Sequence, residues 1–599
     1  MSVLTADPPV TARGQWLALH CFAYWRSPDL DDFLARTVAP LLDRLRAEDR
    51  IADWFYIRYW EGGPHLRIRV RDADPATGAW LREELARQMA EAGYPVGQLS
   101  ADTYYQRLGG PAAVSGAGWH AHGEVAEIAY KPEIHRYGGE RALPVAEEVF
   151  CRSTDIAVRV VAATTSEKTR LAAITELTIA TALALGLDRL ATARWLREHA
   201  GGWRWNSEVA MVPPSVMQER SAKVLALQSG TLQQRWARTE ALIEADPEGL
   251  RSPVARWAAV IRQARERLEA EPAPDGLWHA VWSSQLHMLF NRLGITPDEE
   301  RSVCWLVAGT ALTPQGIPHF FEDGAQAPDR RYHEAAKYLP GDPIDQAPRE
   351  EDGPGSATRV RRRLTGINLP SHELPPVSLA EAMRLRGSAR GRITGPVSDV
   401  DLGTLLWSAH AVTHTQVMAN FEYPHRPYPS AGAKYVARVR LVVRDVAGLE
   451  PGCYHVDPVG RRLAYLGAAP TVADLRAMSM WFQDRTGLVE GLDIGAAPAM
   501  LAVYVELGRL RPRYGMRALR FAVAEAGHLA QNLALVAAAT GLHLGMIGGF
   551  YDDLVHEVFG LDGIDNLAIY LMPVGGSAGA GQQDADDQPA AEKPPKEEG

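Results

Sequence analysis

The sequence predicts an α+β protein with two structured parts joined by a linker. Between residues 15 and 335 strand-like and helical runs alternate, and from Ala142 to about Cys304 long helical runs dominate. Residues 339–376 are a charged stretch punctuated by proline and glycine, and such a segment buries little apolar surface. Periodic apolar patterns return between residues 379 and 576. These observations place a linker between two folded parts.

In the first part, apolar residues at helical spacing predict a helix over Asp29–Arg50. Trp54–Trp60 and His65–Arg71 have strand character, and the four residues Glu61–Pro64 between them predict a hairpin turn. The same apolar spacing predicts further helices at Ala142–Ala163, Glu167–Leu185, Arg189–His199 and Pro253–Leu268.

Composition sets the broad class of the protein. A chain of 599 residues is too long for one hydrophobic core, and a content of 46% hydrophobic and 23% charged residues is typical of soluble proteins. No apolar run reaches the ~20 residues that cross a bilayer, and no signal peptide is visible at the N-terminus. Four widely spaced cysteines argue against a disulfide framework or a metal site, and a net charge of −10 gives no support to direct nucleic-acid binding. We therefore expect a cytoplasmic protein without metal.

Four motifs in the last third point to a flat, phosphate-bearing ligand. Arg386–Arg390 offers two guanidinium groups and a hydroxyl at the end of a helical pattern, and guanidinium forks match phosphate oxygens. Pro429–Gly432 is a tight loop of small side chains, and Gly545–Phe550 allows close backbone approach. Glu525–His528 lies inside an apolar helical pattern, where Gly527 costs about 1 kcal/mol relative to alanine. Each motif alone also fits a structural role as a basic helix end, a turn or a core histidine.

Taken in order, these motifs resemble the nitroreductase-like flavoproteins, and among them the azoline dehydrogenases of ribosomal peptide biosynthesis. The resemblance covers about residues 379–576 and implies an FMN-bound α+β fold, usually a homodimer with FMN at the interface. The implied reaction oxidises a peptide thiazoline or oxazoline to the aromatic azole. The resemblance assigns the FMN phosphate to Arg386, Ser388 and Arg390, and the rest of the cofactor to Pro429, Ser430, Gly432, Gly548 and Gly549.

The base for this oxidation departs from the family pattern. Many azoline dehydrogenases carry a Lys-Tyr pair where this sequence has Arg513 and Tyr514. Because arginine stays protonated, it is a poor base, and it would act electrostatically. Tyr514, a bound water or another residue is left to take the proton.

Three clusters in the first part carry charge and proton-transfer groups. In His65–Arg71, Leu66, Ile68 and Val70 alternate with His65, Arg67, Arg69 and Arg71, so the arginines share one strand face. The segment Tyr130–Gly139 packs turn residues around Glu133 and Arg136. His287 and Asn291 lie four residues apart and share a helix face. The bland alternative for the strand is a half-exposed element with a basic outer face.

These clusters resemble the elimination domain of lanthipeptide dehydratases, which also occurs in thiopeptide biosynthesis. The resemblance covers about residues 14–335. It implies that glutamate is expelled from glutamylated serine or threonine to give dehydroalanine or dehydrobutyrine. A β-elimination needs cations for the leaving carboxylate and a base for the α-proton. The resemblance assigns Arg67, Arg69 and Arg136 to the glutamyl group, His287 to general acid/base chemistry, and Glu133 to orienting or sharing proton transfer.

The combined fold class is α+β: a mixed α/β elimination domain with a helical C-terminal part, followed by a nitroreductase-like FMN domain. The expected domains are 14–335, a linker over 336–378, the FMN domain at 379–576 and a disordered tail at 577–599. Such a fusion resembles those of lactazole-type thiopeptide pathways.

The expected partners are a precursor peptide with leader and core, a separate tRNA-dependent glutamylation enzyme, an azoline-forming cyclodehydratase and a second copy of the chain. Three alternatives stay open. The first part resembles, more distantly, the pyridine synthases of thiopeptide pathways. Either part could instead bind peptide without catalysis. The flavin part could be a general nitro- or quinone reductase.

Overall fold

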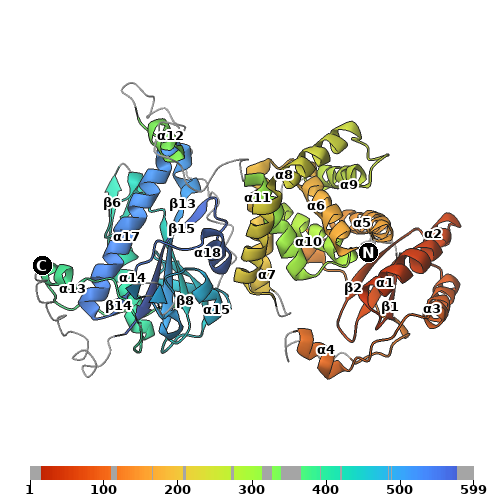
Figure 1. The fold of residues 1–599 in the computed structure, drawn as a ribbon, viewed down its shortest axis with the longest axis horizontal. Coiled ribbons are helices and arrows are strands. Elements are labelled where there is room, and N and C mark those ends of the chain that lie inside the picture. Colours follow the sequence, from red (N-terminus) through yellow and green to blue (C-terminus); the bar gives the residue numbers. More distant parts are fainter. Residues whose placement is uncertain are drawn as a thin grey trace, which may run out of the picture. The chain divides into compact units, whose positions relative to one another are not determined.

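The computed structural model describes residues 15–576 apart from 109–117, 165, 207–210, 271–275, 313–326, 339–365, 392, 419–420, 483–484, 487–488 and 491. The chain divides into two compact units: Met1–Val212 with Glu219–Gly316, and Pro213–Gln218 with Ile317–Gly599. Both units contain helices and strands (Figure 1), so the predicted α+β class is confirmed. The predicted tail lies outside the described residues.

The first unit begins with a four-stranded antiparallel sheet in the order β2-β3-β1-β4. Its strands are β1 (Trp16–Phe22), β2 (Asp53–Tyr59), β3 (His65–Arg71) and β4 (Val125–Glu127). The predicted hairpin is confirmed, because β2 and β3 pair from Asp53 opposite Arg71 to Tyr59 opposite His65. The sequence analysis did not identify β1, the strand on the other side of β3.

The predicted helix over Asp29–Arg50 is interrupted by one wider turn. Helix α1 (Ser27–Phe33) continues through a π-helical turn, η1 (Leu34–Val38), into α2 (Ala39–Ala47). Pro40 explains the interruption: proline has no N–H, and its ring crowds the carbonyl one turn earlier. The backbone N–H of Ala39 instead reaches back five residues to the carbonyl of Leu34.

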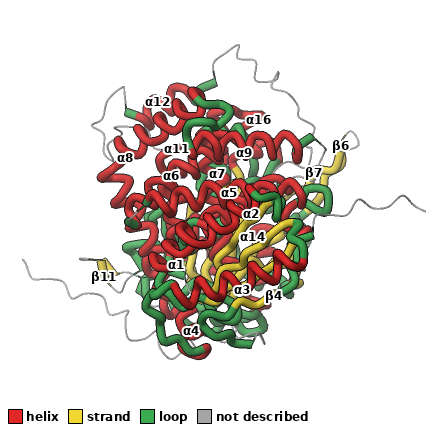
Figure 2. The backbone as a smooth tube through the Cα atoms, turned by 90° about the vertical axis from the view of Figure 1, so that its right-hand side faces the viewer, coloured by secondary structure: helices red, strands yellow, loops and turns green. Residues whose placement is uncertain are grey.

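Helices make up the rest of the first unit, and the part coloured as helix in Figure 2 includes α5, α6, α7 and α9. The side chains of Ser166 and Ser252 cap α6 and α9 by accepting backbone N–H bonds. Each predicted helix is observed, although α7 extends to Asn206. The bounds are α3 (Pro75–Glu91), α4 (Ala101–Leu108), η3 (Ile134–Tyr137), α5 (Leu143–Ala163), α6 (Glu167–Ala184), α7 (Arg189–Asn206), α8 (Pro214–Ala245), α9 (Pro253–Leu268), α10 (Leu277–Arg292) and α11 (Pro297–Leu312). The first residues of α8, up to Gln218, belong to the second unit.

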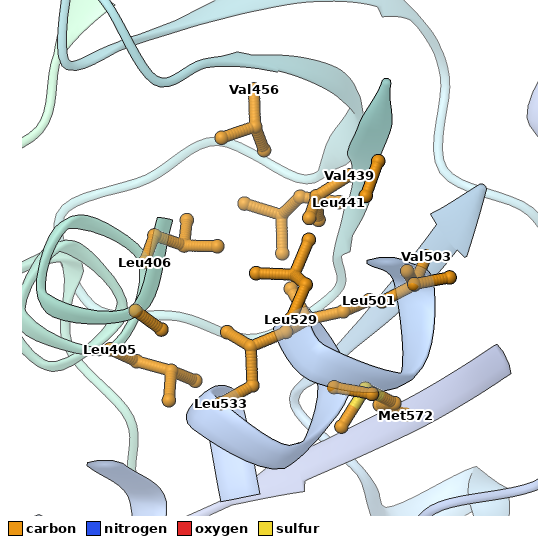
Figure 3. Close-up of a cluster of buried hydrophobic side chains, with 14 of the residues drawn as sticks. Leu405, Leu406, Val439, Leu441, Val456, Leu501, Val503, Leu529, Leu533 and Met572 are labelled. Atoms are coloured by element: carbon orange, nitrogen blue, oxygen red, sulfur yellow. The ribbon is translucent and has the colours of Figure 1, made fainter. Parts of the chain in front are cut away.

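The second unit is built on a seven-stranded sheet in the order β14-β15-β13-β8-β9-β10-β5. Its core packs the sheet against α14 (Asp399–His410) and α17 (Ala518–Thr540), as Leu405, Leu441 and Leu529 show in Figure 3. The strands are β5 (Gly366–Asn368), β8 (Ala437–Val443), β9 (Gly452–Asp457), β10 (Arg462–Gly467), β13 (Ala499–Glu506), β14 (His543–Leu544) and β15 (Asn566–Gly575).

Shorter elements surround this sheet. They are α12 (Pro328–Ala335), α13 (Leu379–Leu385), β6 (His414–Met418), β7 (Phe421–His425), η6 (Ala431–Ala433), α15 (Val472–Ala477), β11 (Arg485–Thr486), β12 (Val489–Glu490), η7 (Ile494–Ala496), η8 (Leu507–Arg509), α16 (Arg511–Tyr514), η9 (Gly515–Arg517) and α18 (Asp552–Phe559). No single described helix is long and apolar enough to span a membrane. By length and composition alone, one pair bent by 119°, Lys168–Ala184 with Arg189–Trp203, passes the same test.

The unit boundary differs from the domain limits expected at residues 335 and 378. Helix α12 packs in the second unit, where the Tyr332 hydroxyl donates to the Met516 carbonyl and Arg517 donates to the Ala336 carbonyl. The end of the expected linker is also folded: β5 pairs with β10, and the Leu369 carbonyl accepts from the Trp407 indole of α14. Sequence composition cannot anticipate these contacts, because they depend on partners far along the chain.

Two glycines on helices of the second unit offer a matched stability test. A Cβ on Gly403 would lie 1.8 Å from the Pro370 carbonyl oxygen, whereas a Cβ on Gly527 would meet nothing within 4 Å. We expect Gly403→Ala to lower the free energy of unfolding of this unit by about 3 kcal/mol through overpacking. Gly527→Ala should raise it by about 0.5–1 kcal/mol through helix propensity. Urea unfolding measures both, and equal effects would contradict the packing of Pro370 on α14.

Candidate functional site

The predicted alternation along β3 is observed, and it divides the sheet into an apolar and a cationic face. Leu66, Ile68 and Val70 are fully buried in the core beneath α1 to α3. Arg67 and Arg69 lie on the opposite face, where the register of β1 sets His20 directly across from Arg67. Arg69 is only 7% exposed, so the alternative of a half-exposed basic strand is wrong for that residue.

Aromatic rings hold the two central arginines. The Arg67 guanidinium lies 3.4 Å from the centre of the Tyr59 ring, and the Arg69 guanidinium lies 4.5 Å from that of Tyr130. Arg67 is also 3.7 Å from a Glu61 carboxylate oxygen. Burial lowers the pKa of both arginines, to about 10 for Arg69, so both stay charged at neutral pH.

Glu133 and Arg136 form a second, more exposed group beside this face. Arg136 donates from Nη1 to Glu133 Oε2 at 3.1 Å and from Nε to Ser284 Oγ of α10 at 3.2 Å. The negative charge of Glu133 acts on Arg67 and Arg69, opposing the dominant effect of burial on their pKa values. The structure therefore groups four of the five predicted residues around one cationic centre.

His287 lies on α10, one turn beyond Ser284, so the two side chains share a helix face. Its Nδ1 is 2.9 Å from Glu300 Oε2, and its ring meets the Trp203 ring edge-on at 4.8 Å. Asn291, which also shares that face, has a structural role: its side chain accepts from the Arg58 N–H and donates to the Arg58 carbonyl. Thus α10 contacts Arg136 through Ser284, Glu300 through His287 and β2 through Asn291.

The sequence analysis missed His20 and gave no role to His65, the two histidines of the cationic face. His20 and His65 stack at 4.9 Å between ring centres, and both are buried. Burial, reinforced by neighbouring cations, lowers the pKa of His20 to about 3, and burial lowers that of His65 to about 4. Both rings are therefore neutral at pH 7. The alternation of Leu17, Leu19 and Cys21 could have identified β1 and hence His20.

In the second unit, the Pro-Ser-Ala-Gly loop and the Glu-Ala-Gly-His helix lie against each other. Ser430 Oγ donates to Glu525 Oε2 at 2.6 Å and accepts from the Tyr435 N–H at 2.7 Å. The other carboxylate oxygen of Glu525 accepts from the Ala437 N–H at 2.8 Å. Glu525 is 2% exposed, so one buried carboxylate fastens the loop to α17. Ser430 is thereby engaged in holding the loop.

The loop also reaches the expected base. Gly432 has a φ of +60°, and a Cβ there would lie 2.5 Å from the Tyr514 hydroxyl. Tyr514 is half-buried and packs edge-on against Phe521 at 5.2 Å, while Arg513 is exposed. Glycine at this position thus leaves room for the tyrosine hydroxyl beside the loop.

Residues Arg386–Arg390, which the sequence predicts to bind a phosphate and which we call the phosphate loop, follow the end of α13. The Ala389 N–H donates to the Leu544 carbonyl at 3.0 Å, which sets the loop beside β14, while Ser388 and Arg390 are exposed and Arg386 is half-buried. The glycine-rich segment Gly545–Phe550 follows β14. In it, the Gly549 carbonyl accepts from Ser479 Oγ at 2.5 Å. A Cβ on Gly548 would meet only the Tyr570 ring, at 3.8 Å. Backbone at Gly548 is therefore open to close approach.

One chain does not bring the two expected cofactor groups together. Leu544, beside the phosphate loop, pairs with Val574, which pairs with Ala499 at the start of β13. Ala437, beside the Ser430 loop, pairs with Val505 near the end of β13. At about 3.3 Å per residue the two loops are separated by roughly 20 Å along the strand.

Comparison with known proteins divides the chain in the same way. Residues 16–311 match the family model described as lantibiotic biosynthesis dehydratase C-term, and residues 394–576 match the nitroreductase family. A Methanocaldococcus jannaschii protein named "Putative nitroreductase MJ1384" is 28% identical over 209 residues, which is 35% of this chain and 95% of that protein.

Two solved structures are also similar. A pyridine synthase from thiomuracin biosynthesis is 18% identical, with 49% of this chain and 97% of that chain covered and a TM-score of 0.40. A Ralstonia eutropha structure of the nitroreductase description is 25% identical, with coverage of 36% and 90% and a TM-score of 0.28.

Glu525→Ala tests the carboxylate clamp. The change leaves the Ser430 hydroxyl and the Ala437 N–H without their acceptor, so we expect the free energy of unfolding to fall by about 3 kcal/mol. Glu525→Gln keeps an acceptor oxygen and should lose less. Denaturant unfolding of the second unit measures both variants.

The same clamp has a pH signature. Burial raises the pKa of the Glu525 carboxyl, so its protonated form is favoured by folding. Its contribution to stability is present below the ordinary glutamate pKa and is lost as pH rises through the folded value. The glutamine variant cannot ionise and should lack this part of the pH dependence. An unchanged stability-pH curve in Glu525→Gln would contradict the raised pKa.

Proposed function

Because the chain joins a lantibiotic dehydratase C-terminal domain to a nitroreductase-family domain, we propose that it is a bifunctional enzyme that matures a ribosomally made, thiopeptide-type precursor. The first unit eliminates glutamate from glutamylated serine or threonine. The second unit oxidises peptide thiazolines or oxazolines to azoles with FMN. A separate tRNA-dependent enzyme supplies the glutamyl ester, and a cyclodehydratase supplies the azolines.

The buried cationic face of β3 is the observation that carries the elimination proposal. In the reaction a base removes the α-proton, the C–H electrons form the Cα=Cβ bond, and the Cβ–O bond breaks to release glutamate. Arg67 and Arg69 keep their charges in a dry site, where they stabilise the departing carboxylate more strongly than in water. Arg136, half-exposed at the rim, binds the other end of the glutamyl group.

Proton transfer in this unit falls to His287. An imidazole titrates near neutral pH and can both take the α-proton and return one to a leaving group. His287 lies one helical turn from Ser284, which accepts from Arg136, so both residues are on the same face of α10. Glu133, paired with Arg136, orients that arginine.

The residues of the second unit fit FMN. Arg386, Ser388 and Arg390 present guanidinium and hydroxyl groups for a phosphate, and the open backbone at Gly548 suits a flat ring, while Gly549 lies against Trp481. FMN supplies a hydride acceptor when bound. Tyr514 takes the azoline proton from beside Gly432, and the exposed Arg513 contributes positive charge there.

A homodimer completes this site. The phosphate loop and the Ser430 loop of one chain lie roughly 20 Å apart along β13. A second copy, placed with the opposite orientation of its sheet, would supply its Ser430 loop to the first copy's phosphate loop. This arrangement explains how two sets of cofactor residues can serve one FMN.

The elimination proposal predicts that Arg67→Ala and His287→Ala each slow glutamate release from a glutamylated peptide by about 100-fold or more. Arg71→Ala is the matched control, since Arg71 lies on the same strand face at its end, beside Trp16. Mass spectrometry of the peptide measures the rate. Normal release by the Arg67 variant, or formation of a pyridine ring by the wild type without release of glutamate, would contradict the assignment.

The oxidation proposal predicts a yellow protein that removes about 2 Da per ring from an azoline peptide. Arg386→Ala combined with Arg390→Ala should lose the flavin absorbance, because the phosphate loses both guanidinium partners. Tyr514→Phe should keep the flavin and slow azole formation by about 100-fold. Arg67→Ala serves as the control that leaves oxidation intact. Flavin reduction by NAD(P)H without any azoline oxidation would favour a general reductase instead.

A further inference from the structure

A buried carboxylate links His287 to a second histidine. Glu300 of α11 is 1% exposed, and its Oε2 is 2.9 Å from Nδ1 of His287 on α10. Its Oε1 is 2.5 Å from Nε2 of His199 on α7. Three helices thus converge on one His-Glu-His array, of which the sequence analysis identified only the first histidine.

The electrostatics of this array keep Glu300 ionised. Burial alone would raise the pKa of its carboxyl group, but the two histidines outweigh burial and hold that pKa well below its usual range. An ionised carboxylate can only accept hydrogen bonds. Both facing ring nitrogens, Nδ1 of His287 and Nε2 of His199, must therefore carry protons.

This protonation pattern assigns the roles of the two His287 nitrogens. With Nδ1–H donated to Glu300, Nε2 is the nitrogen that can take a proton in the neutral ring. Among the described residues, no hydrogen bond of Nε2 is seen. The His287 side chain is 18% exposed, whereas that of His199 is 8% exposed, so His287 is the more accessible end of the array.

The surroundings separate this array from ordinary core packing. Burying an ionised carboxylate is unfavourable unless its partners compensate, and well-packed apolar side chains often stabilise such a position equally well or better. The nearby Cys304 thiol is kept neutral, because burial raises its pKa well above the ordinary value. One turn before His287 on the same face of α10, Ser284 accepts from Arg136 of the proposed glutamyl site. The array therefore connects buried charge to a proton-transfer group at the site.

We propose that Glu300 and His199 are positioning residues that hold His287 with Nδ1 protonated and Nε2 turned to the substrate. Glu300 fixes the tautomer and stabilises the imidazolium that forms when Nε2 takes the α-proton, and His199 holds the carboxylate in place. The catalytic part of this inference rests on the proposed elimination function. The protonation of His287 at Nδ1 does not depend on that function.

Glu300→Gln in the full-length protein is the central test. A glutamine amide can donate to Nδ1, so the ring would shift to the Nε2–H form and lose its base. In ¹⁵N spectra of histidine-labelled protein, the His287 signals, assigned by their absence in His287→Gln, should change from the Nδ1–H to the Nε2–H pattern. The rate constant kcat for glutamate release should fall by about 100-fold or more, with KM changed less than about threefold.

Two further variants separate positioning from stability. Asp246→Asn removes another buried carboxylate of the same unit, one that accepts only backbone N–H bonds, and should leave the His287 spectrum and kcat unchanged. His199→Gln keeps a donor toward Glu300 and should retain most activity, whereas His199→Phe removes it and should slow release by about 10-fold. If Glu300→Gln fails to fold, the comparison of His199→Gln with His199→Phe still tests whether the array positions His287.

An unchanged His287 spectrum in Glu300→Gln, or wild-type kcat in both Glu300→Gln and His199→Phe, would overturn the inference. Failure of the proposed function looks different. In that case the wild type releases no glutamate, while the spectra still show whether Glu300 fixes the His287 tautomer.

Discussion

The first unit depends on positive charge that is held out of water. Both histidines beside the arginines of β3 are neutral at pH 7, because the pKa of His20 is lowered to about 3 and that of His65 to about 4. Arginine does not lose its proton, because even the lowered pKa of Arg69, about 10, keeps its guanidinium charged at pH 7. Burial therefore concentrates charge on Arg67 and Arg69 and removes it from their neighbours. Ring faces of Tyr59 and Tyr130 stabilise these cations without neutralising them, which leaves them able to receive a carboxylate.

In the second unit the buried charged group is a carboxylate, and it holds the fold together by accepting hydrogen bonds. Glu525 joins the loop at Ser430 to the first residue of β8, and α17 carries that carboxylate into the core. Its two oxygens satisfy a hydroxyl and a backbone N–H that would otherwise be buried without partners. The glycine at 432 then places the Tyr514 hydroxyl beside the same loop. The positions of the Ser430 loop and of Tyr514 thus depend on the Glu525 carboxylate and on glycine at position 432.

Local patterns were enough to predict much of this architecture. The period of two along His65–Arg71, the hairpin turn before it and the bounds of α5, α6 and α9 all follow from neighbours within a few residues. The features that the sequence did not predict share another cause. The packing of Pro370 on Gly403, the docking of α12 and the His199–Glu300–His287 array depend on residues far apart in the chain. No local period marks Glu300 as different from any acidic residue in the first turn of a helix.

The two proposed reactions place different demands on protein groups, and the chain meets them with separate residues. Elimination needs fixed cations and a neutral base, and these come from β3, η3 and α10 of the first unit. Oxidation needs a phosphate site, open backbone and a group that takes the ring proton, and the residues proposed for them lie around the sheet of the second unit. Because the two sets share no residue, substitutions in one should add to those in the other without coupling. What the fusion provides is a raised local concentration of one peptide for two active sites, an effect of tethering that requires no contact between them.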